Sequence, residues 1–168
     1  ALGPPPSHFA GPPRLGASDA IRKTLDAVIH VRGGDAAMRG ANPAAREQLP
    51  RIVDALERRA RHSQHGLRVW LHTDSPELPA VRELAAAGRV QLCNGTLCGA
   101  TVLDALRDMV WADWLILTES ALSWAAAWLN ERATLVISPT MTWQPAYARR
   151  PVPVLPEGTL TFEDVLKD

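Results

Sequence analysis

The amino-acid sequence predicts a protein of the α/β class, and three observations lead to this prediction. Continuous apolar runs of strand length recur along the chain, as is typical of strands that are covered on both faces. Segments with helical spacing of apolar residues separate these runs. Strands that alternate with helices form right-handed βαβ units, so the sheet should be parallel. The expected architecture is a Rossmann-like open parallel sheet with helices on both faces.

The expected elements alternate along the chain. The strands are expected at residues 27–31, 67–72, 89–93, 114–118 and 133–138. The helices are expected after Pro43 and at residues 76–88, 101–111 and 119–131. The third of these helices should bury one apolar face, made by Val102, Leu103, Leu106, Met109 and Val110. The last helix is apolar almost all round, and its Trp124 and Trp128 lie four residues apart, so both are expected in the core.

The 168 residues are enough for one domain with a proper core, and three segments are expected. Residues 1–20 hold most of a Pro/Gly cluster and should form a linker or an extended arm. Residues 21–150 should form the α/β domain, and residues 151–168 should form a C-terminal extension. The chain begins with Ala rather than Met, which suggests a processed or excised piece of a longer protein.

The composition argues against several classes of partner. The chain has 18 basic and 18 acidic residues, so nothing in its charge suggests a nucleic acid or an anionic membrane. The hydrophobic content of 46% and the charged content of 21% are ordinary for a soluble globular protein. No apolar run reaches membrane-spanning length. Cys93 and Cys98 either close one small disulfide loop or stay as buried thiols, so the compartment is left open.

Polar and charged residues follow each expected strand. The segments are HVRGGD (30–35), HTDSPE (72–77), CNGT (93–96), LTESALSW (117–124) and SPT (138–140). Open parallel sheets bind ligands beyond the carboxyl ends of their strands, where these segments should converge on one crevice. This convergence is a stronger indication of function than any single motif.

Arg32 is followed by Gly33 and Gly34 at the end of the first strand. A guanidinium is a planar fork of donors that matches phosphate oxygens, and adjacent glycines let the backbone approach an anion closely. These residues form either a phosphate clamp or an ordinary glycine turn beside a solvated arginine. The pattern is neither a Walker loop nor the three-glycine dinucleotide fingerprint.

Ser120 and Asp74 leave similar alternatives open, and Asp104 raises a question of its own. Ser120 begins a helix, and a helix N-terminus binds anions readily, although an ordinary N-cap has the same pattern. Asp74 either hydrogen-bonds a ribose or sugar, or caps the turn before the next helix. Asp104 is expected on the apolar side of its helix, where its carboxylate would need a partner.

Three segments in order resemble a known family. HVRGGD (30–35) resembles the HxRxxD-type motif of the α1,2-, α1,6- and protein O-fucosyltransferase superfamily. Residues 104–130 resemble a second motif of the α1,2-fucosyltransferases, an Asp opening a helix, then an apolar strand, then Ser-x-Phe-Ser-Trp and a Leu-Asn ending. HTDSPE (72–77) resembles the segment between them. The order and the spacing agree over roughly residues 25–140.

The resemblance implies a fold and a reaction. The chain would be the C-terminal, donor-binding domain of a GT-B glycosyltransferase, which holds GDP-fucose for inverting transfer of fucose to a glycan hydroxyl. The acceptor would be a glycan or glycoprotein, and an N-terminal acceptor domain of the parent chain would bind it. Relatives work in the Golgi lumen of eukaryotes or in the bacterial cytoplasm, and this chain carries no address that separates the two.

The resemblance also implies roles for individual residues. Arg32 would contact the diphosphate and stabilise the departing GDP, with no metal needed. His30 and Asp104 would lie near the nucleotide, and Asp104 would accept hydrogen bonds from guanine. Ser120 would contact phosphate. The other positions assigned to the donor site are Gly33, Gly34, Asp35, Asp74 and Ser123.

The sequence departs from the family pattern, and two other functions stay open. Gly33 stands where many relatives have a second Arg, and Ser75 replaces the second Asp of the middle motif. The second Arg lost at Gly33, together with the acceptor-binding half that this chain lacks, favours a non-catalytic nucleotide-sugar-binding or structural remnant as the first alternative. The second alternative is a metal-dependent phosphohydrolase, with mixed nitrogen and oxygen ligands from four strand-end residues. Its ligands would be His30, Asp35, His72 and Asp74.

Overall fold

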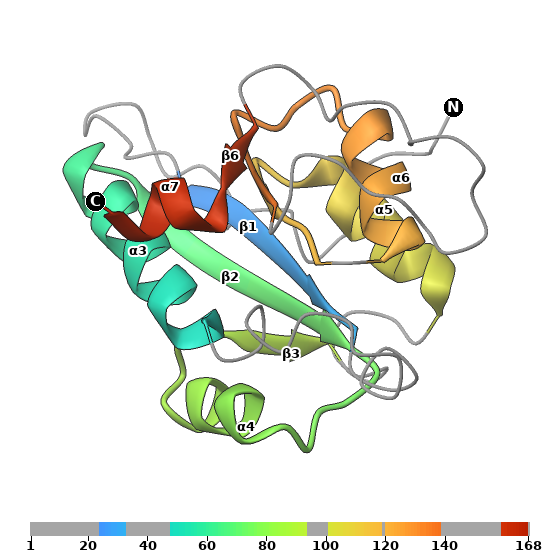
Figure 1. Cartoon of the computed structure of the whole chain (residues 1–168), viewed down its shortest axis with the longest axis horizontal. Helices are drawn as coiled ribbons and strands as arrows, with labels where there is room; N and C mark the ends of the chain where they lie inside the picture. The colour runs from blue at the N-terminus through green and yellow to red at the C-terminus, as the bar shows by residue number, and fades with distance from the viewer. Residues whose placement is uncertain (1–23, 33–47, 94–100, 119, 139–158, 168) are drawn as a thin grey trace, which may run out of the picture.

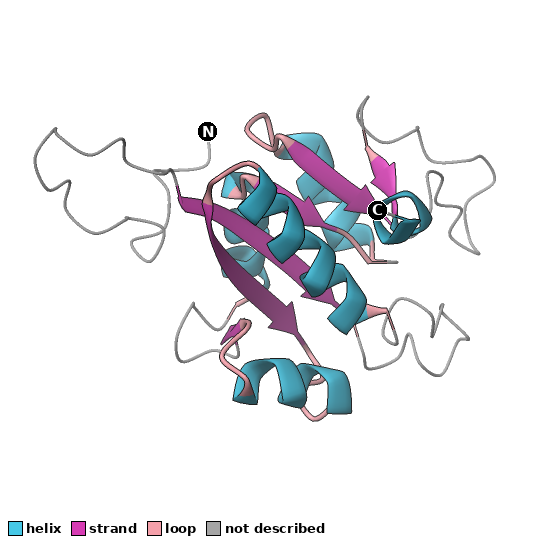
Figure 2. Ribbon diagram, turned by 90° about the vertical axis from the view of Figure 1, so that its left-hand side faces the viewer, coloured by secondary structure: helices cyan, strands magenta, loops and turns pink. Residues whose placement is uncertain are grey.

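The computed structural model describes residues 24–32, 48–93, 101–118, 120–138 and 159–167. Within these residues six strands form one sheet, and helices lie on both of its faces (Figures 1 and 2). All neighbouring strands of the sheet pair in parallel. The structure therefore confirms the predicted α/β class and its Rossmann-like open parallel sheet.

The strands run across the sheet in the order β3–β2–β1–β4–β5–β6. Their bounds are β1 Thr24–Val31, β2 Gly66–Thr73, β3 Gln91–Cys93, β4 Trp114–Ile116, β5 Leu135–Ser138 and β6 Leu160–Thr161. The first strand lies at the centre, and its eight residues all pair with β2 in register. On its other side, residues Ala27 to Ile29 pair with β4. The two halves of the sheet thus join along β1.

Two helical layers bury the two faces of this sheet. The helices α3 (Leu49–His62), α4 (Pro79–Ala86) and α7 (Phe162–Lys167) pack on one face. The helices α5 (Val102–Trp111) and α6 (Ala121–Leu129) pack on the other. Successive side chains of a strand point to opposite faces. Ile29 therefore belongs to the core under α3, and Val28 belongs to the core under α5 and α6.

Local sequence signals fix the ends of the helices. Thr101 and Asp104 form a capping box at the start of α5, in which each side chain accepts a hydrogen bond from the other residue's backbone N–H. After α4 the chain turns at Gly88, whose φ of 66° is a left-handed conformation that costs glycine little. These signals explain why α5 begins and α4 ends where they do.

A partly buried ion pair lies at the amino-terminal end of the sheet. The Asp26 carboxylate accepts hydrogen bonds from Arg68 Nε and Nη2, both at 2.8 Å, and from Trp70 Nε1 at 3.0 Å. The backbone N–H of Asp26 donates to Asp113 Oδ2 at 3.1 Å, which links β1 to the residue before β4. Because Asp26 is buried, these bonds supply the partners that its charge requires.

Two expectations about the core are wrong. Trp124 is buried as expected, but Trp128 is 50% exposed, one residue before the end of α6. On α5, the first-turn residues Val102 and Leu103 are 67% and 70% exposed, so the buried face starts further along the helix. Leu106 packs against the core, and Met109 and Val110 are buried within it.

Some expectations concern residues whose structure is not described. The proposed arm at residues 1–20 and the start of the expected helix at Pro43 lie outside the described residues. Within the C-terminal extension, residues 159–167 add β6 and α7 to the domain, and β6 was not expected. None of the helices in the described ranges has the length and apolarity needed to cross a membrane.

Candidate functional site

The strand order places a topological switch point between β1 and β4. Chain connections from β1 lead through α3 to β2 on one face, whereas β3 leads through α5 to β4 on the other. The order 3-2-1-4-5-6 is the one in which ligands bind at such a border, outside the carboxyl ends of the strands. The candidate site is therefore sought where β1 and β4 end.

Two buried hydroxyl groups lie at the end of β4. Thr118 is 8% exposed and Ser120 is 2% exposed. In the part of the chain that the structure describes, neither Thr118 Oγ1 nor Ser120 Oγ has a hydrogen-bond partner. Buried polar groups are normally hydrogen-bonded, and an unpaired one destabilises the fold. Two such groups, two residues apart in the chain, indicate a place where a ligand would supply the missing hydrogen bonds.

Ser120 is also the N-cap of α6, and its side chain makes no capping hydrogen bond. The first turn of a helix presents backbone N–H groups that have no partner within the helix, together with a partial positive charge. An anion bound there would accept from these groups and from the Ser120 hydroxyl. The start of α6 thus has the chemistry of a phosphate site.

Arg32 follows β1 at the same edge of the sheet. Ile29 of β1 pairs with Ile116 of β4, so Val31 and Thr118 each lie two residues beyond this pair. Arg32 is the next residue after Val31 and is exposed. Its guanidinium therefore belongs to the same strand ends as the two buried hydroxyls. The predicted phosphate ligands Arg32 and Ser120 come from the two strands that flank the switch point.

His30 and Ser123 are brought together across the β1–α6 interface. His30 Nδ1 and Ser123 Oγ share a hydrogen bond of 2.6 Å, and Ser123 is fully buried. Burial lowers the pKa of His30 from its usual 6.5 to about 4, and the neighbouring His72 and Arg32 act in the same direction, against Asp74. His30 is therefore neutral at pH 7. The hydrogen bond between the Ser123 hydroxyl and His30 positions α6 against β1.

Asp74 and Asp104 lie on the side of β2 and α5. Asp74 is exposed immediately after β2, and Ser75 Oγ donates a hydrogen bond to it at 3.3 Å. Asp104 has the partner that its carboxylate needed, because its Oδ2 accepts from the Thr101 hydroxyl at 2.7 Å. These Thr101 bonds, and more weakly Arg107, lower the pKa of Asp104. Its position is the half-buried cap of α5 instead of the expected apolar side.

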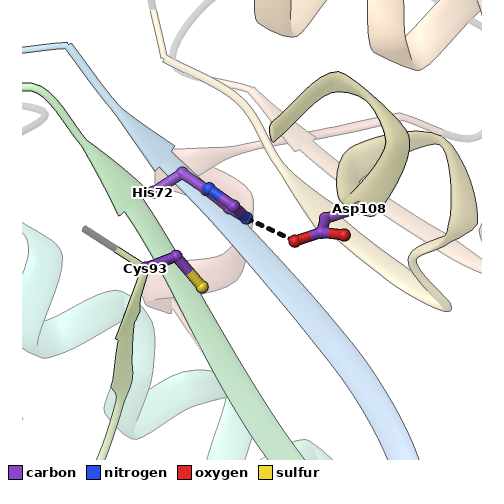
Figure 3. A group of neighbouring side chains, drawn as sticks. All are labelled: His72, Cys93 and Asp108. Carbon is purple, nitrogen blue, oxygen red and sulfur yellow. Dashed lines mark hydrogen bonds and ion pairs between the residues drawn. The ribbon is translucent and has the colours of Figure 1, made fainter. Parts of the chain in front are cut away.

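A row of polar side chains crosses three strands just below the candidate site. His30 of β1 pairs in register with His72 of β2, which pairs with Cys93 of β3. His72 Nε2 lies 2.9 Å from Asp108 Oδ2, and both residues are buried. Figure 3 shows the side chains of His72, Cys93 and Asp108 converging from two strands and α5. Cys93 is disulfide-bonded, which decides between the two alternatives that the sequence leaves open for this residue.

Asp108 and Cys93 are not predicted from the sequence as members of this cluster. The predicted site residue on this helix is Asp104, which lies one turn earlier. A signal was present, because Asp108 directly precedes the buried Met109 on the apolar face of α5. Of the proposed metal quartet, His30 and His72 are neighbours, whereas Asp35 lies outside the described residues. Gly33 and Gly34 lie outside them as well.

Comparisons with known proteins add no relative to this description. No family model matches the chain, and neither the curated proteins nor the solved structures contain a match to it. The chemistry of the site is therefore inferred from its residues alone. It combines a guanidinium, a helix N-terminus and two buried hydroxyls that lack partners in the described ranges, at the border of β1 and β4. This set of donors and positive charge suits an anionic ligand.

Proposed function

We propose that this chain is the donor-binding domain of a fucosyltransferase that uses GDP-fucose. The observation that carries the proposal is a pair of buried hydroxyls, Thr118 and Ser120, which have no hydrogen-bond partner among the described residues and lie at the start of α6 near the end of β1. A diphosphate is an acceptor-only group that would satisfy both hydroxyls and the first-turn N–H groups. The resemblance of three segments to fucosyltransferase motifs supports GDP-fucose as the nucleotide sugar.

Arg32 supplies the positive charge for the reaction in this proposal. When the bond between fucose and GDP breaks, negative charge develops on the diphosphate, and a guanidinium held at the strand end stabilises that charge. Neutral His30, fixed by Ser123, keeps the neighbouring strand end free of a second positive charge at pH 7. The acceptor, a glycan or glycoprotein hydroxyl, would be presented by another domain of the parent protein.

Titration calorimetry of the chain with GDP tests the proposal. GDP should bind with the same affinity in the presence and absence of EDTA. Arg32→Ala should weaken binding by about tenfold or more, since it removes a charge-assisted hydrogen bond of about 1.5–3 kcal/mol. The matched control is Arg82→Ala, an exposed arginine on α4, which should leave the affinity unchanged.

Two results would contradict the proposal. GDP that fails to bind the folded chain would exclude a donor site. Equal affinities for wild type, Arg32→Ala and Ser120→Ala would place any bound GDP somewhere other than the β1–β4 border. Transfer of fucose from GDP-fucose to a glycan by the parent protein then separates a catalytic donor domain from a non-catalytic one.

A further inference from the structure

His72, Cys93 and Asp108 form a compact, buried group of three metal-ligand side chains. One ligand atom from each residue lies within 4.8 Å of the other two (Figure 3). The three residues are 4%, 4% and 1% exposed, so the group is not a chance meeting of solvated side chains. They come from β2, β3 and α5, and this meeting depends on the fold, because no local spacing brings them together.

The donor set fits Zn²⁺ better than a hard cation. Zinc takes thiolate, imidazole and carboxylate ligands, whereas Mg²⁺ and Ca²⁺ prefer oxygen ligands alone. In a tetrahedral zinc site, neighbouring ligand atoms are about 3.3–3.6 Å apart for the usual metal–ligand lengths. The His72–Asp108 separation of 2.9 Å would have to open slightly, and the other separations, which are all within 4.8 Å, would have to adjust to this range. Both movements are within the reach of side-chain adjustment.

The oxidation state of Cys93 decides whether this site exists. A sulfur in a disulfide has no thiolate charge to offer a metal, and Cys93 is disulfide-bonded. We propose that reduction of this disulfide creates a zinc site from His72, Cys93 and Asp108, so that metal binding to the domain is controlled by redox conditions. This proposal does not depend on the nucleotide proposed above.

An external reductant supplies the two electrons that reduction of the disulfide requires. A phosphine and one water reduce the disulfide to two thiols, and the phosphine becomes a phosphine oxide. On zinc binding, the Cys93 thiol loses its proton to solvent and ligates as thiolate. His72 ligates through Nε2, so the proton of its hydrogen bond to Asp108 leaves this contact for solvent, the neutral imidazole carries its one proton on Nδ1, and Asp108 ligates as carboxylate. These three ligands leave the fourth position of a tetrahedral ion open.

Metal titration of the whole chain, before and after reduction with a phosphine, tests the proposal. Reduced protein should bind Zn²⁺ at least about 100-fold more tightly than oxidised protein, because one ligand of three is gained. With Co²⁺ as a spectroscopic probe, only reduced protein should show the thiolate-to-metal charge-transfer band. Cys98 is the only other cysteine of the chain, so Cys98→Ser should bind zinc without any reductant.

Controls separate this site from chance binding and from misfolding. Cys93→Ser and Asp108→Asn should each lose the reduction-dependent affinity while circular dichroism shows a folded chain. His62→Ala removes an exposed histidine outside the cluster and should bind zinc as wild type does. Equal zinc affinity in oxidised and reduced protein, or a cobalt spectrum without the charge-transfer band, would overturn the proposal.

Discussion

His30 of β1 and Ser123 of α6 lie 93 positions apart in the chain and share a hydrogen bond of 2.6 Å. The bond ties the central strand to the first turn of the helix whose N-terminus faces the candidate phosphate site. It also satisfies the only polar group that the fully buried Ser123 side chain carries. The position of α6 relative to Arg32 therefore depends on this contact.

Ser123→Ala should destabilise the protein by about 1–2 kcal/mol, because it leaves His30 Nδ1 without this partner at the interface of β1 and α6. The matched control is Ser120→Ala, a buried serine at the start of the same helix whose hydroxyl has no partner in the described structure. That control should change the free energy of unfolding by less than about 0.5 kcal/mol. Urea denaturation followed by circular dichroism measures both. Equal losses in the two variants would show that the bond contributes nothing.

The stability of the protein should fall as the pH drops below 6.5. His30 has a pKa of about 4 in the folded state and 6.5 as its ordinary value, so the unfolded state binds the proton first. The stabilisation is complete above pH 6.5 and is lost as the pH falls toward 4. For His30 alone, moving from pH 7 to pH 5 should cost at most about 2 kcal/mol.

His30→Leu isolates this contribution from that of the acidic residues. Between pH 7 and pH 5, the unfolding free energy of wild type should fall relative to that of His30→Leu by at most about 2 kcal/mol. Urea denaturation of both proteins at the two pH values gives the difference. An unchanged difference would mean that His30 titrates alike in the folded and unfolded chain.

Arg68→Met should destabilise the protein by about 2–3 kcal/mol, because it leaves the buried Asp26 carboxylate with fewer donors. Arg89 offers a matched control, since it also makes two ion pairs, with Asp54 and Glu57. Those carboxylates are 49% and 30% exposed, so Arg89→Met should cost under about 1 kcal/mol. Thermal and urea unfolding would rank the two variants, and a larger loss for Arg89→Met would contradict the assignment.

Thr101→Ala and Asp104→Asn should separate the structural role of Asp104 from its proposed role in guanine binding. Thr101→Ala removes the cap of α5 and should cost about 1 kcal/mol of stability, with little change in GDP affinity. Asp104→Asn should weaken GDP binding more than it weakens binding of a pyrimidine nucleoside diphosphate. Calorimetry with both nucleotides makes the comparison. Equal effects on the two nucleotides would limit Asp104 to capping.

The strands could be predicted because burial on both faces leaves a sequence signal. Residues 27–31 and 114–118 are continuous apolar runs, and both lie in the centre of the sheet. The two-residue strand β6 is too short to show any period, so it was missed. The sequence predicts Trp128 in the core because α6 is apolar almost all round. This pattern does not show which residues of the helix other elements cover, and Trp128 is in fact half exposed.

The candidate site was predictable only in part, and for a related reason. Arg32 and Ser120 follow strands, so topology alone places them at one edge of the sheet. The cluster of His72, Cys93 and Asp108 draws one residue from each of three elements, and its signal exists only after the strands have paired. Likewise, it is the packing of the described residues that leaves the Thr118 and Ser120 hydroxyls without hydrogen-bond partners among them, and no sequence motif records this.

The strands differ in how many residues they pair, and this difference should set how fast their backbone amides exchange with solvent. All eight residues of β1 pair with β2, whereas β6 is two residues long and holds the sheet edge by its pairing with β5. Amide protons exchange with solvent through openings that start where few contacts hold an element. Exchange should therefore be fastest at β6 and slowest at the centre of β1. Arg32 directly follows the strand that should exchange most slowly, so its backbone should stay in place while the periphery of the domain opens.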